Sequence, residues 1–312
     1  MRAFRLTALD TAPVLLETDS PEPKPGANQV HIQVYAAGVT PAELGWYPTS
    51  HNNDGSKRRA ATPGHEFSGV IAALGADTQG FSVGDEIFGL NDWFADGASA
   101  EYCVADTTGI LPKPATLTHA EAAAVPIGAL TAWQGLERVR LQEGERILVH
   151  GGAGAVGVFV NQMARRRGAH VITTASARNQ NFVLRLGAEQ AIDYATQRFE
   201  ELVGNPDVVF DCVGGETLGR SWSVLKPGGR LVTIASDNEN ADDPRTKDAF
   251  FIVEPNSHQL AEIGKLLDNG ELRVFVDAEV PLSEAAAAYS RTIQSRRGYG
   301  KTVIVMPANK NR

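Results

Sequence analysis

The chain has 312 residues, of which 43% are hydrophobic and 21% are charged, and this balance excludes a disordered or fibrous protein. No apolar run reaches the roughly 18 to 20 residues of a membrane helix, and the first residues lack the apolar core of a signal peptide. The net charge of −8 argues against nucleic-acid binding, and the two cysteines, Cys103 and Cys212, are too few for a disulfide framework. We therefore expect a cytoplasmic globular protein with about two domains that binds neither nucleic acid nor membrane.

Short β-branched runs separated by proline and glycine turns fill the first part of the chain. They cover residues 30–39, 66–75 and 82–90. Many short strands hide their edges best in a compact, barrel-like arrangement. We predict a β-rich domain over residues 1–118.

Strand and helix patterns alternate from residue 119 onward. Strands are expected at 145–150, 170–175, 191–194, 207–212 and 230–235, with helices at 156–167, 181–187 and 218–225. This alternation predicts βαβ units and a doubly wound parallel sheet over residues 119–255, an α/β architecture. The remaining segment, 256–312, is too short for a third domain and is expected to close one of the first two.

A glycine-rich turn joins the first strand and helix of this α/β part. Residues 152–157, GAGAVG, fit the G-x-G-x-x-G pattern between a buried strand and a helix. Glycines let a pyrophosphate approach the backbone, and the free amides at the helix N-terminus hold the anion. We predict a dinucleotide site whose phosphate contacts are Gly152, Ala153, Gly154, Ala155 and Val156.

The second strand of the α/β part should deliver a residue to the adenosine ribose. An NAD site places an acid there, but no acid occurs between Gly152 and Glu189. Ser176 and Arg178 stand there instead, and a hydroxyl and a guanidinium suit a 2′-phosphate. This pattern favours NADPH over NADH.

Several segments, in order, resemble the medium-chain dehydrogenase/reductase superfamily, quinone-oxidoreductase-like branch, over essentially the whole length. They are PGHEFSGVI (63–71), VGDEIFGL (83–90), AVPIGALTAW (124–133), VHGGAGAVG (149–157), FDCVGG (210–215), LKPGGRLV (225–232) and GKTVIVM (300–306). The resemblance implies a GroES-like catalytic domain, a Rossmann domain, and a tail that returns to the catalytic part.

The chain departs from zinc-dependent members of that superfamily at the metal ligands. Thr40 stands where those members place a ligand cysteine, and the third ligand position falls near Ile127. His65 and Glu66 of the GHE segment remain, but catalytic zinc wants three N, S or O ligands. We therefore predict no metal and a structural role for His65 and Glu66.

Without zinc, the easier chemistry is hydride transfer from NADPH to a quinone or an α,β-unsaturated carbonyl. Thr40 is the candidate donor to the developing oxyanion, unless its hydroxyl only caps the turn into Pro41. Four loop aromatics either wall a flat substrate pocket or pack on their own domain: Trp46, Tyr47, Trp93 and Phe94.

The resemblance also implies further cofactor contacts and a homodimer. Residues expected near the nicotinamide are Thr131, Val213, Gly214, Phe250, Phe251 and Val253; Tyr194 is expected beside Ser176 and Arg178, and Gly300 and Lys301 from the tail. Two other functions stay open, an enoyl-thioester reductase and a catalytically idle NADPH-binding sensor or structural protein.

Overall fold

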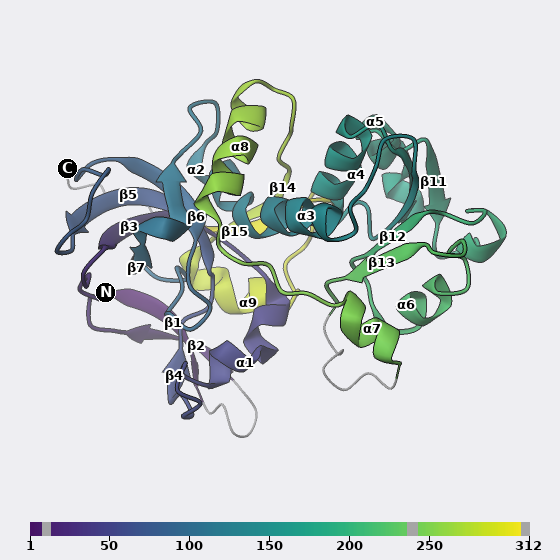
Figure 1. The fold of residues 1–312 in the computed structure, drawn as a ribbon. Coiled ribbons are helices and arrows are strands. Elements are labelled where there is room, and N and C mark those ends of the chain that lie inside the picture. Colours follow the sequence, from purple (N-terminus) through teal and green to yellow (C-terminus); the bar gives the residue numbers. More distant parts are fainter. Residues whose placement is uncertain (8–13, 236–242, 307–312) are drawn as a thin grey trace.

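The computed structural model describes residues 1–7, 14–235 and 243–306, which form two lobes (Figure 1). The first lobe is rich in strands and contains the N-terminus, and the second is a parallel sheet flanked by helices. The lobes meet at α3, Pro126–Arg138, and α8, Ser257–Asp268.

The first lobe contains two sheets. The small sheet has the order β2-β1-β4, with β1 Arg2–Thr7, β2 Val14–Asp19 and β4 Ala60–Ala61. The large sheet has the order β14-β15-β3-β5-β6-β8, and β7 pairs with β3 beside this path. Its first-lobe strands are β3 Gln29–Gly38, β5 Glu66–Leu74, β6 Glu86–Leu90, β7 Tyr102–Asp106 and β8 Ile110–Pro112.

Short helices connect these strands to each other and to the second lobe. The 3₁₀ helix η1 leads from β3 into α1, and α2 is capped by Thr118, whose hydroxyl accepts a hydrogen bond from the Glu121 amide. Their bounds are η1 Pro41–Gly45, α1 Tyr47–Ser50, η2 Thr107–Gly109 and α2 His119–Ala123.

The second lobe is built on five parallel strands in the order β11-β10-β9-β12-β13. These strands are β9 Arg146–His150, β10 His170–Ala175, β11 Gln190–Asp193, β12 Val208–Asp211 and β13 Arg230–Thr233. Its helices are α4 Gly157–Arg166, η3 Ala177–Asn179, α5 Gln180–Arg185, η4 Phe199–Glu201, α6 Gly215–Ser221 and α7 Pro244–Ala249. The strand order reverses between β9 and β12, where doubly wound sheets bind ligands. The predicted fold class is confirmed.

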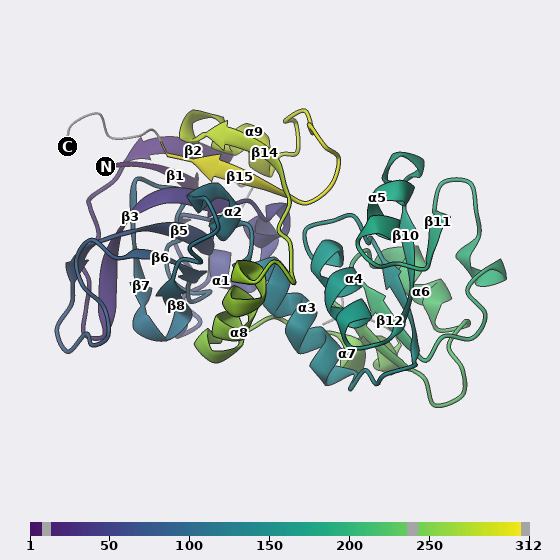
Figure 2. The same ribbon diagram turned by 90° about the horizontal axis from the view of Figure 1, so that it is seen from above.

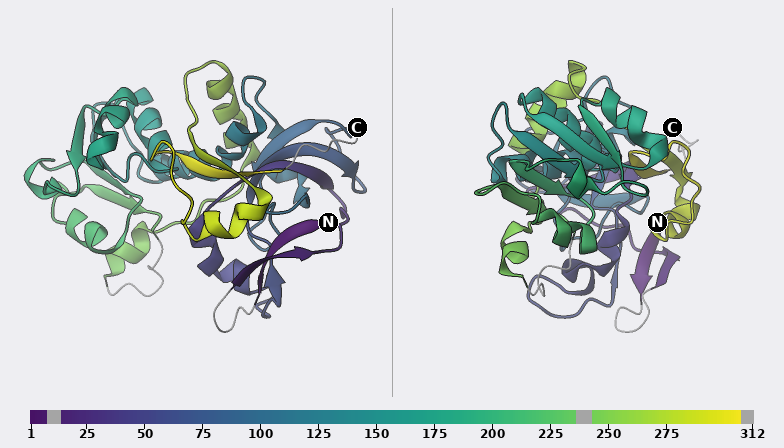
Figure 3. Two further views of the ribbon diagram at one scale, coloured as in Figure 1. Left: turned by 180° about the vertical axis from the view of Figure 1, so that it is seen from behind. Right: turned by 90° about the vertical axis from the view of Figure 1, so that its right-hand side faces the viewer.

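The last two strands of the chain join the first lobe. β15, Lys301–Val305, pairs antiparallel with β3, and β14, Val276–Pro281, pairs parallel with β15. Figures 2 and 3 show these yellow strands beside the purple N-terminal ones. Two short helices lie between β14 and β15 in the chain, η6, Leu282–Glu284, and α9, Ala285–Tyr289. Residues far apart in the sequence therefore meet at the start of β15.

The two lobes share one hydrophobic core. Phe88 and Leu90 of β6 belong to the same buried cluster as Leu130 of α3, Val149 of β9 and Phe159 of α4. This continuous packing fixes the first lobe relative to the strand ends of the second.

Candidate active site

The glycine-rich turn lies between β9 and α4, as the sequence predicted. Gly151 has a φ of 74°, and a Cβ on Gly152 would overlap the side chain of Thr173, so both positions require glycine. Asn161 of α4 donates to the Gly152 carbonyl over 2.9 Å and holds the turn against the helix. Glycine at these positions opens the approach that a pyrophosphate needs.

The turn also presents free donors at a helix N-terminus. In the described part of the chain, no backbone carbonyl accepts from the amides of Ala155 and Val156. The carbonyl of Ala153 is occupied, because the amide of Gly300 donates to it over 2.9 Å. Two unpaired amides beside the positive end of α4 suit a phosphate, and the tail lies directly against this turn.

The end of β10 carries the residues that the sequence assigned to the adenosine side. Arg178 is exposed and, among the described residues, forms no hydrogen bond or ion pair. Its guanidinium lies over Gly298, where an added Cβ would be 2.5 Å from the Arg178 Cζ atom. Tyr194 is 65% exposed and follows β11, whose last residue pairs with the last residue of β10, so Tyr194 lies close to Ser176. Ser176, Arg178 and Tyr194 therefore lie at the same end of the sheet, where the exposed Arg178 guanidinium can contact an anionic ligand.

A second turn at the sheet edge is held by a buried acid. Asp211, at the end of β12, accepts from the amides of Val213 and Gly214 over 3.1 and 3.0 Å, and from the Thr233 hydroxyl over 2.8 Å. The Val213 side chain is 53% exposed and lies against Gly151. Both turns therefore open to the same side of the sheet, at the reversal of strand order.

The loop between β3 and η1 places Thr40 against a buried lysine from the tail. Thr40 precedes η1, and its side chain makes no capping hydrogen bond, so the capping alternative is wrong. The ammonium Nζ of Lys301 instead donates to Thr40 Oγ1 over 2.7 Å. The same ammonium forms an ion pair with the carboxylate of Glu66.

Glu66 is completely buried at the start of β5. Its Oε2 atom accepts from the amide of Ile127 over 2.9 Å, and its Oε1 atom faces Lys301. Burial raises the pKa of Glu66, and the charge of Lys301 opposes this rise. Glu66 therefore links the tail to the start of α3 and, through Lys301, to the loop that carries Thr40.

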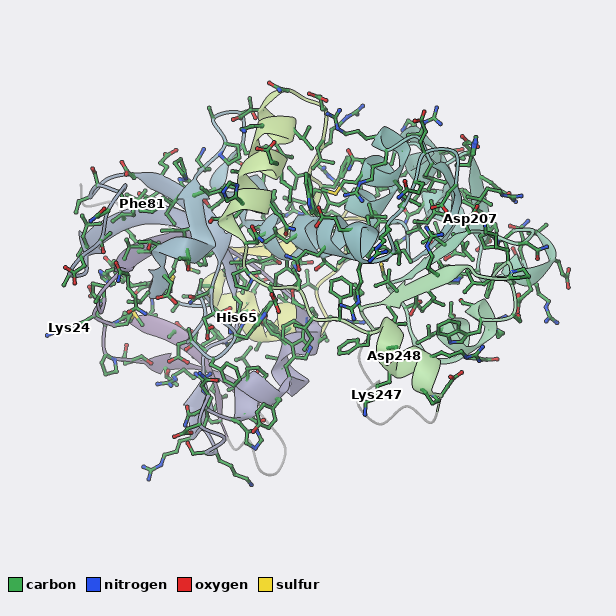
Figure 4. The ribbon with its side chains drawn as sticks, viewed as in Figure 1. Lys24, His65, Phe81, Asp207, Lys247 and Asp248 are labelled. Carbon is green, nitrogen blue, oxygen red and sulfur yellow. The ribbon has the colours of Figure 1, made fainter. Side chains whose placement is uncertain are left out.

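A second buried acid, Glu43 of η1, was not singled out from the sequence. Its carboxylate accepts from Nδ1 of His65 over 2.6 Å, from the Gly64 amide over 3.1 Å and from the Tyr289 hydroxyl over 3.0 Å. Burial, followed by the Glu43 charge, raises the pKa of Tyr289. These bonds fix the His65 ring and leave its buried Nε2 atom without a partner. Figure 4 shows His65 near the middle of the molecule, where the lobes meet.

Two of the four predicted pocket aromatics come together. The Trp46 and Trp93 rings meet edge to face with centroids 5.1 Å apart, and Trp93 also lies 5.2 Å from the His65 ring. Trp93 Nε1 donates to the Val253 carbonyl over 3.0 Å, so this wall reaches the second lobe. Tyr47 instead stacks on His51, and half-buried Phe94 makes no ring contact in the described residues.

The other residues expected near the nicotinamide lie where the lobes meet. Thr131 is buried in α3, and Phe250 forms a bridge with Thr233 at the open side of β13. Phe251 and Val253 pack on the shared core, whereas Ile252 between them is 56% exposed. The side chain directed to solvent in this segment is thus one that the sequence analysis did not select.

The donors around Thr40 do not match a catalytic zinc site. Among the described residues, no three His, Cys, Asp or Glu side chains are grouped to hold a metal. Thr40 offers a hydroxyl, Ile127 offers only its backbone, and Glu66 is already paired with Lys301. Cys103 and Cys212 lie elsewhere, and burial raises the pKa of both thiols, which keeps them protonated.

Comparison with known proteins identifies the family. The model of the alcohol dehydrogenase GroES-like domain matches residues 26–115, and that of the zinc-binding dehydrogenase matches residues 186–304. The 2-methylene-furan-3-one reductase of Solanum lycopersicum is 32% identical, covering 97% of this chain and 79% of the relative. The chain belongs to the medium-chain dehydrogenase/reductase superfamily. Its segments place it in the quinone-oxidoreductase-like branch.

Solved structures of this superfamily superpose on the whole chain. The quinone oxidoreductase from Coxiella burnetii has a TM-score of 0.86 and 29% identity, covering 98% of this chain and 99% of that one. A mycobacterial protein complexed with NADPH has a TM-score of 0.81 and 27% identity, covering 98% and 99%. The chain is thus an enzyme, a pyridine-nucleotide-dependent oxidoreductase. None of the helices in the described residues is long and apolar enough to span a membrane.

Proposed function

We propose that the enzyme is an NADPH-dependent, zinc-independent reductase that transfers hydride to a quinone or an α,β-unsaturated carbonyl. The observation that carries this proposal is the hydrogen bond that the Thr40 hydroxyl accepts from Lys301. Because Thr40 Oγ1 is the acceptor, the hydroxyl proton of Thr40 remains available to a substrate oxygen. A polarised hydroxyl stabilises an enolate or quinol oxyanion without a metal.

The preference for NADPH is supported by charge at the end of β10. Arg178 is exposed and follows Ser176 by two residues, and no acid occurs between Gly152 and Glu189. A charge-assisted hydrogen bond contributes about 1.5 to 3 kcal/mol, which corresponds to roughly ten- to a hundredfold in affinity.

The protein residues orient and polarise the reactants. A bound dihydronicotinamide supplies the hydride. The free amides of Ala155 and Val156 suit its pyrophosphate, and Trp46 with Trp93 forms an apolar wall for a flat substrate. Thr40 then donates to the substrate oxygen as negative charge accumulates there, which favours the transition state over the ground state.

An enoyl-thioester reductase is the second candidate, and a basic cavity on the first lobe favours it. This cavity of ≈ 490 Å³ is lined by Arg5, Asn52, Lys57, Arg58, Arg59 and Ala60. Asp96 accepts from Arg5 and Arg58, so part of this charge is balanced. Phosphate groups of an acyl carrier suit such a rim.

Steady-state oxidation of NADPH with a panel of quinones, free enones and enoyl thioesters tests these alternatives. We expect turnover with quinones or free enones. Faster turnover of the thioesters that falls steeply with salt would favour the second candidate. Tight NADPH binding without turnover of any acceptor would indicate an idle sensor or structural protein.

A further inference from the structure

The ammonium of Lys301 is a buried cation at the catalytic loop. Lys301 is 5% exposed, although it lies at the first position of β15 and 261 residues from Thr40. An ammonium has three N–H donors; one of them donates to Thr40 Oγ1, and the ammonium also forms an ion pair with Glu66. The position is set by the β15–β3 pairing, which brings Val303 opposite Gly38 at the end of the strand that leads to Thr40.

Lys301 and Glu66 form a buried ion pair whose net charge is zero. Glu66 is fully buried, and its other oxygen accepts from the Ile127 amide. Gly38 makes room for the carboxylate, since a Cβ at that position would lie 2.5 Å from Glu66 Oε1. Glu66 thus holds the Lys301 ammonium in place, and the ammonium also contacts Thr40.

This ammonium contacts residues in two of the segments that supply metal ligands in zinc-dependent relatives. Thr40 stands at the position of the missing cysteine and bonds to the ammonium directly. Glu66 of the GHE segment forms an ion pair with it, and the amide of Ile127, near the third position, donates to Glu66. Two of these residues, Thr40 and Glu66, therefore contact a positive charge supplied by the chain itself.

We propose that Lys301 is the internal cation of the active site and acts through Thr40 to stabilise negative charge on the substrate oxygen. This inference rests on the proposed function. The C4–H bond of NADPH breaks, and the hydrogen with both bonding electrons forms a C–H bond to the electrophilic carbon of the substrate. The π electrons of the substrate move to its oxygen. NADPH is oxidised, the substrate is reduced, and a proton from water completes the product. Lys301 is a positioning residue that strengthens the Thr40 donor, and Glu66 holds it in place.

A set of variants separates this role from a structural one. Lys301→Met with Glu66→Gln removes both charges and leaves no buried charge unpaired. We expect kcat with an enone to fall about ten- to a hundredfold, while the KM for NADPH stays unchanged. Lys113→Met with Glu86→Gln is the control, because the Lys113 side chain is 8% exposed in the same lobe and pairs at 3.3 Å with Glu86, which is exposed. This control should retain the parental rate.

The dependence on Thr40 is tested by combination. If Lys301 acts through Thr40, adding Thr40→Val to the Lys301→Met, Glu66→Gln variant lowers kcat by less than about twofold further. Parental turnover by the folded charge-free variant would overturn the proposal. Losses that multiply in the triple variant would overturn it as well.

A binding measurement without turnover completes the test. The absorbance of p-nitrophenol bound to the NADP⁺-loaded enzyme reports whether the phenol is ionised. We expect the parent to shift ionisation of the bound probe to lower pH, and the charge-free variant to lose this shift. A shift in an enzyme that reduces no quinone or enone would refute the proposed function and leave the inference standing. Reduction without any shift would refute the inference.

Discussion

Replacing Lys301 alone by methionine should destabilise the enzyme strongly. The substitution leaves the Glu66 carboxylate fully buried with the Ile127 amide as its remaining partner. Breaking a buried ion pair by removing one partner costs about 3 to 5 kcal/mol. For a protein of this size, the melting temperature should fall by on the order of 10 °C near neutral pH.

The pH dependence identifies the cause of this loss. Burial raises the pKa of Glu66, and Lys301 opposes this rise, so the pKa rises further when the lysine is removed. A carboxyl whose pKa is raised in the folded state contributes stability below its ordinary pKa and loses it as the pH rises through the raised value. The difference in melting temperature between the Lys301→Met variant and the parent should therefore be small in acid and increase towards neutral pH.

Circular dichroism melts at several pH values measure this difference. Adding Glu66→Gln to Lys301→Met removes the unpaired charge, and this double variant should recover most of the melting temperature at neutral pH. A Lys301→Met protein that melts within about 2 °C of the parent would contradict the reasoning, given the expected shift. So would a double variant that is less stable than the single one.

Four further predictions concern the cofactor, the donor, the metal and the assembly. Arg178→Glu should weaken NADPH binding about ten- to a hundredfold and NADH binding far less, and equal dissociation constants of the parent for both cofactors would contradict the preference. Thr40→Val should lower turnover of an enone more than that of a quinone, because a quinone delocalises the negative charge better. Parental rates with both substrates would show that another group is the donor. Elemental analysis of chelator-treated, active enzyme should find no stoichiometric zinc, and loss of activity that zinc restores would refute this. Light scattering should report a homodimer, since β13 lies at the edge of its sheet, and a mass of about 33 kDa at micromolar concentration would exclude it.

Local sequence patterns were sufficient for the fold class. The glycine turn before α4 and the alternation of β9, β10 and β12 with helices are features of neighbouring residues, and the structure has them where they were expected. The contacts of the catalytic loop join distant residues instead. Lys301 meets Thr40 only because β15 pairs with β3, and no periodicity in the sequence reports such a pairing.

The burial of the acidic residues was the part of the site that was hardest to predict from the sequence. Glu43 looks like a surface residue in a loop, but it is fully buried with three hydrogen-bond donors around it. Its one local signal is a position three residues after Thr40, in the turn that begins at Pro41. The role of Arg178 toward a cofactor stays a prediction, because it depends on contacts with a bound nucleotide.

Single-turnover reduction with NADPH deuterated at C4 tests the central claim most directly. The reaction would be run with an enone and with a quinone, and the products analysed by mass spectrometry and NMR. The account predicts that the label leaves NADPH with a primary isotope effect, and that the reduced enone carries one deuterium at its electrophilic carbon. NADPH that stays unoxidised with both acceptors, or a reduced enone without label, would contradict it.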